Sequence, residues 1–431
     1  GENSAGRRAR RPVRRIPTLL RLAARGVLRE ARRSLLTASA MALGLALLMF
    51  TRSLADGGHE DWIDAGVRMG AGHVLVQAPG YRESQSLDDR LSGNQAGAAL
   101  AALAVLEGPL APLATTVRLS TNGLASSASS ALPVVIDGVD PRTEVGFSQA
   151  AERITEGRYL EPGDRLAAYV GQGLVERLGL SLGSRFVLTA QATDGEIQGQ
   201  LVRVVGVFRT GLPEVDEGLV HIPISVARSW LGAGDAATTV GALLPVSAVA
   251  AEVAEAVRFD MGTDDVRVLG WREAYPELDA ALRLDDYGDY VFLGILFAIV
   301  ALAVLNTVLM AVLHRKREFG VLQALGLTPA ETGLVVFTEG LLLTALAGVV
   351  GMIAGATLTW VFFRNGLDFS FFISEEMTFA GIVIDPVIVP EFRMVQVMQS
   401  FLSIAVVGTV ASIYPAYHAT KIDVGEALKF E

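Results

Sequence analysis

The sequence contains no cysteine and only three lysines among its 431 residues. The absence of cysteine excludes disulfide bonds and thiolate chemistry, although it does not identify a cellular compartment. None of the lysines, Lys316, Lys421 and Lys429, completes a G-x-x-x-x-G-K-[ST] loop. Such a loop supplies the backbone cradle and the cation that hold nucleotide phosphates. The sequence therefore lacks this means of binding ATP.

Recognisable catalytic motifs are also missing. Of the five histidines, only His59 stands beside other candidate metal ligands, Glu60 and Asp61. No H-E-x-x-H helix or second ligand cluster follows, so we interpret these three residues as solvated loop residues rather than a metal site. No G-x-S-x-G nucleophile elbow occurs either. We expect no catalytic residue, no metal site and no enzyme activity in this sequence.

Charge is scarce and unevenly placed. Charged residues make up 19% of the chain and hydrophobic residues 51%, and the formal net charge is −10. A soluble protein usually has about 25% charged residues. Arginines recur through residues 1–34, so the rest of the chain is strongly acidic. A basic leader before an apolar run is suited to anionic lipid, and nothing in this pattern indicates a nucleic-acid partner.

Four apolar segments are long enough to cross a bilayer, which takes roughly 20 helical residues. They cover residues 35–54, 290–313, 333–363 and 395–417. Basic residues precede the first segment and follow the second and the fourth. By the positive-inside rule both termini are then cytoplasmic, and residues 55–289 and 364–394 lie outside.

The first apolar segment has a second interpretation. Arg32 and Arg33 precede it, as in a twin-arginine signal that would be removed near Ala55. The run is long for a signal, no small-x-small cleavage site follows, and three more spans remain, so we favour an uncleaved helix. Residues 16–34 carry arginines along one helical face and predict an interfacial helix, whereas residues 1–15 are expected to be disordered.

Residues 55–289 read as a mixed α/β domain. Strands are expected at 73–77, 132–136, 185–189 and 201–208, and helices at 95–106, 173–178 and 247–257. Gly179 and Gly183 are expected in turns that need positive φ. Residues 120–132, rich in serine and alanine, are expected to form a flexible loop. An inserted subdomain is expected around 150–235.

Two short segments carry the most information about function. Residues 314–328 form a basic, amphipathic stretch between two membrane-length runs, and residues 414–428 read YPAYHATKIDVGEAL. A connector needs only polar residues, so apolar side chains such as Phe319 and Leu322 indicate a surface that docks into a partner. Both segments resemble the signatures of bacterial ABC-transporter permeases of the LolC/LolE, MacB and FtsX type. Residues 171–188 and 202–216 are similar to the periplasmic core domain of MacB-type members.

The resemblance implies a membrane α-helical protein with four transmembrane helices and a large extracytoplasmic α/β MacB-like domain inserted between helices 1 and 2. The expected segments are a basic N-terminal segment with an interfacial helix (1–34), transmembrane helices (35–54, 290–313, 333–363 and 395–417), a periplasmic domain of two subdomains (55–289), a cytoplasmic coupling helix (314–332), an external loop (364–394) and a cytoplasmic tail (418–431).

Residues 317–326 are close to the R-E-x-G-x-L-x-A-x-G pattern of the family, which implies a helix that couples to a separate ATPase. The coupling residues are Arg317, Glu318, Phe319, Gly320, Leu322, Ala324 and Gly326. Phe319 and Leu322 would present an apolar knob, and Arg317 and Glu318 would pair across the interface. Gly320 and Gly326 would permit close approach and end the helix.

Further candidates lie within the apolar segments. Glu339, followed by Gly340, is expected to have a structural partner, such as an arginine of the coupling helix, because an unpaired carboxylate in a membrane is costly. Asn306 either bonds across a helix interface or is merely tolerated. Small residues recur at Ala347, Gly351 and Gly355 and suit close helix packing within the subunit or across a dimer.

The resemblance implies a permease subunit without a cofactor of its own, acting with two copies of an ATPase that binds ATP and magnesium and with a second permease subunit. Mechanotransmission would extract a lipoprotein from the inner membrane and release it towards a periplasmic carrier. Residues 190–200 lack the proline-containing hook of LolC-like members, so carrier binding stays open. The rivals are MacB-like export of a peptide, antibiotic or lipid with a periplasmic adaptor, and FtsX-like regulation of a cell-wall hydrolase.

Overall fold

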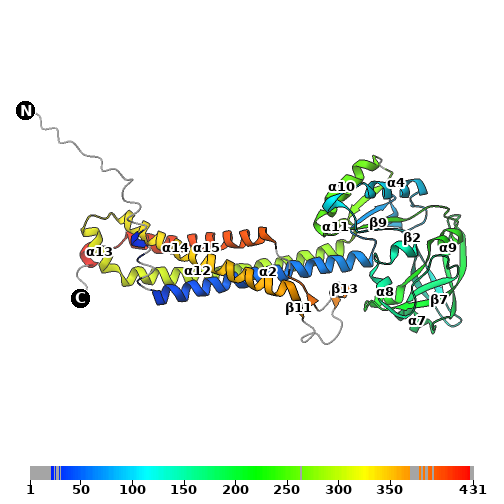
Figure 1. Ribbon diagram of the computed structural model, residues 1–431, viewed down its shortest axis with the longest axis horizontal. Coiled ribbons are helices and arrows are strands. Elements are labelled where there is room, and N and C mark those ends of the chain that lie inside the picture. The colour runs from blue at the N-terminus through cyan, green and yellow to red at the C-terminus, as the bar shows by residue number, and fades with distance from the viewer. Residues whose placement is uncertain are drawn as a thin grey trace, which may run out of the picture. The chain divides into compact units, whose positions relative to one another are not determined.

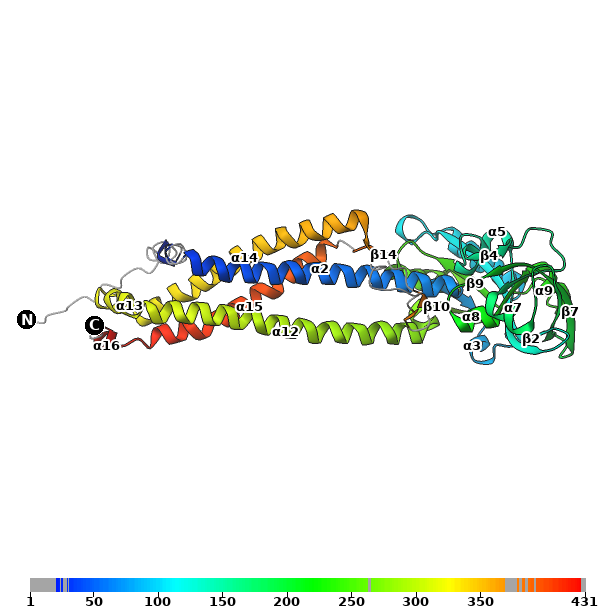
Figure 2. The ribbon, with the colours of Figure 1, turned by 90° about the horizontal axis from the view of Figure 1, so that it is seen from below.

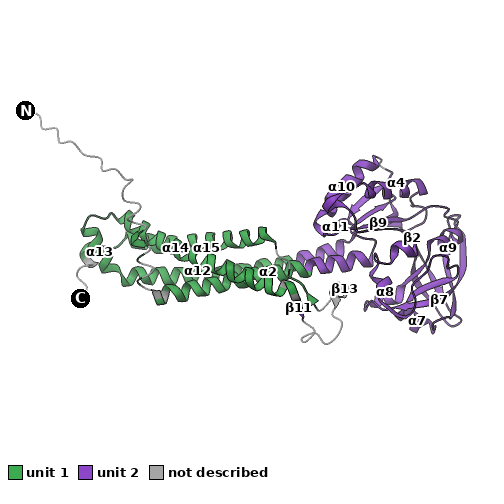
Figure 3. Cartoon of the chain, viewed as in Figure 1, with its two compact units in different colours: residues 1–58, 285–367, 387–431 green, residues 59–284, 368–386 purple. Residues whose placement is uncertain are grey.

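The computed structural model describes residues 21–23, 25, 29, 31–262, 265–368, 378–379, 382–383, 387–390 and 393–427. In this part of the chain, four helices are long and apolar enough to cross a membrane. They are α2 (Ala31–Met69), α12 (Pro276–His314), α14 (Pro329–Asn365) and α15 (Met394–Thr420). Each is longer than the apolar run that predicts it, because polar turns continue the helix. The chain divides into two compact units (Figure 3).

Unit 1 comprises residues 1–58, 285–367 and 387–431. Its membrane-length helices lie side by side in both ribbon views (Figures 1 and 2). The short helices α13 (Lys316–Ala324) and α16 (Val424–Ala427) lie at one end of the bundle, and the two-residue strands β11 (Leu367–Asp368) and β14 (Val387–Ile388) pair with each other. Residues 369–377 of the expected external loop (364–394) lie outside the described residues.

Small residues on α14 let neighbouring helices approach closely. A Cβ added at Gly351 would lie 2.7 Å from the backbone oxygen of Ala42, and one at Gly355 would lie 3.0 Å from Cα of Ala46. Both contacts belong to α2 of the same chain, and Ala347 is buried on the same face. The structure therefore places this packing within the subunit. Gly340 faces the opposite neighbour, α15, where an added Cβ would clash with the Ser412 side chain.

Unit 2, residues 59–284 and 368–386, is built on one large sheet. The strand order is β10-β1-β9-β2-β3-β8-β5-β7-β4, and β6 pairs with both β2 and β7. The strands are β1 (Val74–Gln77), β2 (Ala114–Ser126), β3 (Ala131–Val139), β4 (Ile154–Gly157), β5 (Ala167–Gly171), β6 (Arg185–Gln191), β7 (Ile197–Phe208), β8 (Leu219–Pro223), β9 (Thr239–Leu243) and β10 (Arg267–Gly270). Residues 378–379 (β12) and 382–383 (β13) form a separate two-stranded pair.

Short helices cover the sheet. They are α3 (Tyr81–Ser84), α4 (Gly93–Ala104), α5 (Pro141–Glu144), α6 (Gln149–Glu152), α7 (Gln172–Leu178), α8 (Pro213–Gly218), α9 (Ile224–Trp230), α10 (Ala250–Met261) and α11 (Trp271–Ala274), with 3-10 turns η2 (Gly108–Leu110) and η3 (Ser247–Val249). Helices α4 and α10 pack on the β1–β9 half, with Ala99 and Val253 in the shared core. Ser92 begins α4 with a capping box to Gln95, which satisfies two backbone donors.

The other half of the sheet closes into a barrel. Strands β2, β3, β8, β5, β7 and β6 pair in turn, and β6 pairs again with β2. Alternation in β6 places Phe186, Leu188 and Ala190 inside the barrel. The sequence places the inserted subdomain at 150–235, whereas β2 and β3, which precede residue 150, also form barrel walls.

Several expected elements are confirmed and two are wrong. The strands expected at 73–77, 132–136, 185–189 and 201–208 correspond to β1, β3, β6 and β7, and Gly179 and Gly183 both have positive φ. Residues 120–126 are not a loop, because they belong to β2 and pair with β3 and β6 on either side. Ala125 in this stretch is fully buried in the barrel core.

His59, Glu60 and Asp61 are not loop residues either, since all three lie within α2. Both carboxylate oxygens of Glu60 accept hydrogen bonds from Ser247, one from its backbone N–H and one from its hydroxyl. Glu60 thus holds the turn before α10. Within the described residues, no cluster of three or more histidine, aspartate or glutamate side chains is arranged to hold a metal ion.

Candidate coupling element and helix-packing sites

The connection from α12 through α13 to α14 is a tight helical turn. Helix α12 ends at His314, α13 begins at Lys316, and Gly326 takes φ 102° just after α13 ends. This left-handed conformation favours glycine, as the sequence pattern indicates. Thr328 then caps α14 through a capping box with Glu331, which fixes where the next helix begins.

Arg315 is the centre of an ion-pair network in this turn. Its Nη1 donates to both carboxylate oxygens of Glu339 at 3.1 and 3.0 Å, and its Nε donates to Glu318 at 3.1 Å. The guanidinium also lies 5.1 Å from the ring centroid of Phe319. Arg315 and Glu339 are mostly buried, so neither charge is left unpaired at the end of the bundle. The expectation that Glu339 pairs with an arginine of this segment agrees with this geometry.

The prediction that Phe319 is part of an exposed apolar knob is wrong. Phe319 is 1% exposed and packs into the core of the helix bundle, and Leu322 is half-buried against the same core. Glu318 is already paired within the chain, with Arg315 and with Arg29 at 2.6 Å. Aromatic burial and internal ion pairing therefore fix α13 to its own bundle.

A different face of α13 is exposed. Arg317, Val321, Ala324 and Leu325 recur at helical spacing, and Leu325 is 81% exposed. Gly320 is buried on the opposite side, where the helix lies against its own chain, and α16 packs against α13. The exposed apolar residues beside Lys316 and Arg317 form a basic, amphipathic surface, which we call the α13 outer face (Lys316, Arg317, Val321, Ala324 and Leu325).

Asn306 lies on an exposed face of α12 in the isolated chain. The hydrogen bond that joins α12 to α2 is made by the next residue, Thr307, whose Oγ1 lies 2.7 Å from Oγ1 of Thr37. Asn306 therefore takes no part in this contact within the subunit.

Sequence reasoning missed the central residue of the network. Arg315 lies outside the family pattern at 317–326, and Arg29 lies in the basic leader. The available signal was the acidic Glu339 in an apolar helix that follows a basic turn. A carboxylate there needs a cation, and the hairpin between α12 and α14 brings the first basic residue after the span close to it.

Comparison with known protein families accounts for most of the chain. The model of the MacB-like periplasmic core domain matches residues 34–281, which is more than half of the sequence, and the model of the FtsX-like permease C-terminal region matches residues 290–424. The chain belongs to the FtsX/MacB family of ABC transporter permeases. Permeases of this family are multi-pass membrane proteins that act with an ATPase.

The curated relatives agree with this family. The lipoprotein-releasing system transmembrane protein LolC of Neisseria meningitidis is 24% identical over 74% of this chain and 78% of its own length. LolC of Xylella fastidiosa is 25% identical over 69% of this chain and 73% of its own length. The macrolide export ATP-binding/permease protein MacB of Nitrobacter winogradskyi is 25% identical over 39% of this chain and 23% of its own length. Among solved structures, the periplasmic region of MacB from Actinobacillus actinomycetemcomitans matches with a TM-score of 0.34 and 13% identity, covering 49% of this chain and 95% of that one.

Proposed function

We propose that this permease couples ATP hydrolysis by a separate ATPase to movement of an extracytoplasmic α/β domain, and that it extracts lipoproteins from the inner membrane. The observation that carries the proposal is the extent of the similarity to LolC, which covers about three quarters of both chains. Similarity to the MacB exporter covers a much smaller part of each protein, 39% of this chain and 23% of MacB. In this arrangement both termini are cytoplasmic, unit 2 is periplasmic, and the partner ATPase binds ATP and magnesium.

The energy scale agrees with an ATP-driven process. Three acyl chains contain roughly 45 methylene groups, and at about 0.8 kcal/mol each their full exposure to water would cost on the order of 35 kcal/mol. Extraction therefore needs both work and continuous apolar shielding. Two ATPases, one on the cytoplasmic side of each of two permease subunits, would supply this work and transmit it through α13.

The α13 outer face is the surface that we assign to the ATPase. Leu325 and Val321 supply exposed apolar area, and Arg317 supplies positive charge, whereas Phe319 holds α13 to the bundle that must move with it. A push on this face is transmitted to α12 and α14, because Arg315 bonds to Ala311 of α12 through its backbone N–H and to Glu339 of α14 through its side chain. The coupling role of Gly320 and Gly326 is then to shape the turn.

The test is reconstitution with the partner ATPase in proteoliposomes that contain a triacylated lipoprotein. ATP-dependent transfer of the lipoprotein to a soluble fraction supports the proposal, whereas ATP-dependent export of a macrolide without lipoprotein release would replace it with MacB-like transport. Leu325→Asp should abolish ATPase binding, and Leu113→Asp, at an exposed position in unit 2, is the matched control. If both variants bind the ATPase equally, the α13 outer face is not the docking surface.

A further inference from the structure

Helices α2 and α12 join neighbouring strands of unit 2. Helix α2 ends at Met69 and is followed by β1, whereas α12 begins at Pro276 and is preceded by β10 and the short helix α11. Strands β1 and β10 are paired antiparallel, with Val74 opposite Gly270. The two helices are therefore connected to adjacent strands of one sheet.

A hydrogen bond joins these two connections directly. The hydroxyl of Tyr275, the residue before α12, accepts from the backbone N–H of Ala71 at 2.7 Å. The N–H groups of Gly70 and Gly72, on either side of Ala71, donate instead to carbonyl oxygens of α2. A backbone N–H that is shielded from water needs an acceptor, and Tyr275 supplies it here. The end of α2 is thus completed by a side chain at the start of α12.

Gly70 makes room for this hydrogen bond. A Cβ added at this position would lie 2.6 Å from the ring carbon Cζ of Tyr275, which is closer than real Cβ atoms approach. Because glycine has no Cβ, the ring lies directly against the backbone at the end of α2, and its hydroxyl reaches Ala71. A larger residue would displace the ring and break the bond.

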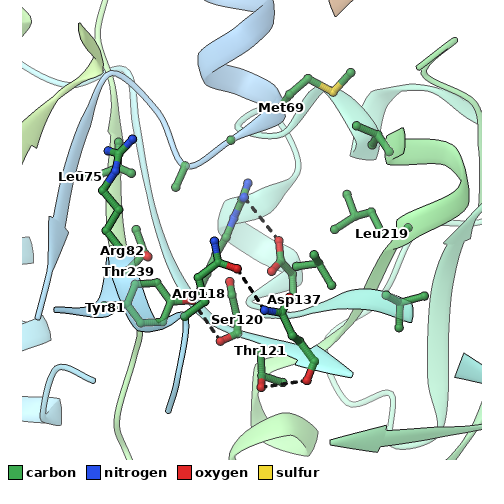
Figure 4. Close-up of a pocket in the computed structure, with 18 of the residues that line it drawn as sticks. Met69, Leu75, Tyr81, Arg82, Arg118, Ser120, Thr121, Asp137, Leu219 and Thr239 are labelled. Atoms are coloured by element: carbon green, nitrogen blue, oxygen red, sulfur yellow. Dashed lines mark hydrogen bonds and ion pairs between the residues drawn. The ribbon is translucent and has the colours of Figure 1, made fainter. Parts of the chain in front are cut away.

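Two cavities border the junction. One has a volume of about 810 Å³ and is lined by Gly70 and Tyr275, and Figure 4 shows Met69, the last residue of α2, among its lining side chains. The other, of about 420 Å³, is lined by the same three residues. Ile63 of α2 and Leu278 of α12 share the core of unit 2, but apolar contacts have no direction and allow sliding. The hydrogen bond of Tyr275 is directional, so it fixes one register between the two helices.

Motion of α12 has two routes into the sheet. Along the chain, α12 is connected to the sheet through α11 and β10, and β10 is an edge strand that pairs with β1 over four residues. Through Tyr275, α12 is also attached to Ala71 and so to the start of β1. Strand β1 is paired on both sides, with β10 and with β9. The second route therefore distributes a force over two strand pairings, whereas the first loads a single one.

We propose that Tyr275 is a positioning residue for transport, whose hydroxyl clamps the start of α12 to the end of α2 so that both helices move unit 2 as one body. The inference rests on the proposed function, in which a force on α13 travels along α12. The clamp carries this force into β1 and β9. Without the hydroxyl, α12 slides past α2 and the force acts on β10 alone.

Spin labels can follow the clamp, because the chain has no cysteine of its own. Leu284→Cys, on α12, and Leu113→Cys, just before β2, introduce two labelling sites at exposed positions. Electron paramagnetic resonance measures the distance between the labels in the full chain with its partner ATPase, without nucleotide and with vanadate-trapped ATP. With Tyr275 present, both states should give the same single distance. Tyr275→Phe should lower the ratio of clamped to unclamped molecules roughly tenfold, as expected for loss of one hydrogen bond, and add a second distance with trapped ATP.

Two further variants test the cause. Gly70→Ala should give the same second distance, because its methyl group displaces the ring. Tyr169→Phe is the matched control, since it also loses a buried tyrosine hydrogen bond, to the carbonyl of Ala150 at 2.8 Å, but in a separate hydrophobic cluster of unit 2. This control should keep the single distance. A single distance in Tyr275→Phe, or a second one in Tyr169→Phe, would overturn the clamp.

Lipoprotein release separates this inference from the proposed function. In proteoliposomes, Tyr275→Phe should hydrolyse ATP like the wild type but release less lipoprotein for each ATP, whereas Tyr169→Phe should match the wild type in both. Equal release per ATP by Tyr275→Phe and the wild type would contradict the clamp. If the wild type releases no lipoprotein while the distances behave as expected, the proposed function fails and the clamp stands.

Discussion

His73 should make the stability of unit 2 depend on pH. The side chain is 2% exposed at the start of β1, and its Nδ1 accepts a hydrogen bond from the backbone N–H of Leu244 at 3.2 Å. Burial lowers the pKa of His73 from 6.5 to about 4, although nearby Glu60 acts in the opposite direction. Protonation would also remove the acceptor that Leu244 needs.

The sign and size of the effect follow from this shift. The unfolded chain takes up a proton near pH 6.5, whereas the folded domain does so only near pH 4, so the stabilisation is fully present above pH 6.5 and is lost as the pH falls to about 4. At 1.36 kcal/mol per pKa unit, the difference amounts to about 3 kcal/mol. This is a large share of the stability of an ordinary domain.

Chemical denaturation of the full chain in detergent, followed by tryptophan fluorescence, measures the effect. Trp271 reports on the same unit, because it is buried in the core that β1 helps to form. The comparison is wild type against His73→Asn, which keeps an acceptor near the Nδ1 position but does not titrate. His314→Asn, at an exposed position, is the control. The wild type should lose about 3 kcal/mol more than His73→Asn between pH 7.5 and pH 4. A difference below about 1 kcal/mol would refute the reasoning.

Three further predictions concern the helix bundle. Gly355→Leu should destabilise the bundle by about 1–3 kcal/mol, because its side chain would meet α2, whereas Gly294→Leu has open space and should be neutral in a thermal melt. Phe319→Ala should cost about 3–5 kcal/mol of bundle stability through the cavity it leaves, and an unchanged melt would mean that α13 is not held by this residue. Arg315→Met should cost about 3–5 kcal/mol by removing the guanidinium that pairs with the mostly buried carboxylate of Glu339, and adding Glu339→Leu should recover most of the loss. Equal melting temperatures of the single and double variants would contradict that account.

Much of the fold could be predicted from the sequence because its signals are local. Long apolar runs identify the four membrane helices, and the glycines at 179 and 183 mark turns that need positive φ. The prediction of a loop at 120–132 was wrong because serine and alanine have a weak intrinsic preference for strands, so the local sequence does not indicate β2. Pairing on both sides by β3 and β6 decides the conformation there, and such pairing is invisible in a local window.

The candidate site was predictable only in part. The basic pattern at 317–326 located the turn, and the acidic Glu339 indicated a cationic partner. The direction in which Phe319 points could not be predicted, because an amphipathic helix has an apolar side whether it faces its own chain or a partner. The hydrogen bond between Ala71 and Tyr275 was missed for a related reason. The two residues are 204 positions apart in the chain, and only the pairing of β1 with β10 brings them together.

The closed barrel in unit 2 has a mechanical consequence. In an open sheet a pulled edge strand can peel away one hydrogen bond at a time. In the closed barrel, each of the strands β2, β3, β8, β5, β7 and β6 is instead paired with a neighbour on both sides. A force that pulls on one barrel strand is therefore shared between the hydrogen bonds to its two neighbours, and both sets of bonds must break together. The free edges of the sheet are β4 and β10, outside the ring. A domain that is repeatedly strained during a transport cycle would deform at these edges first and keep its barrel intact.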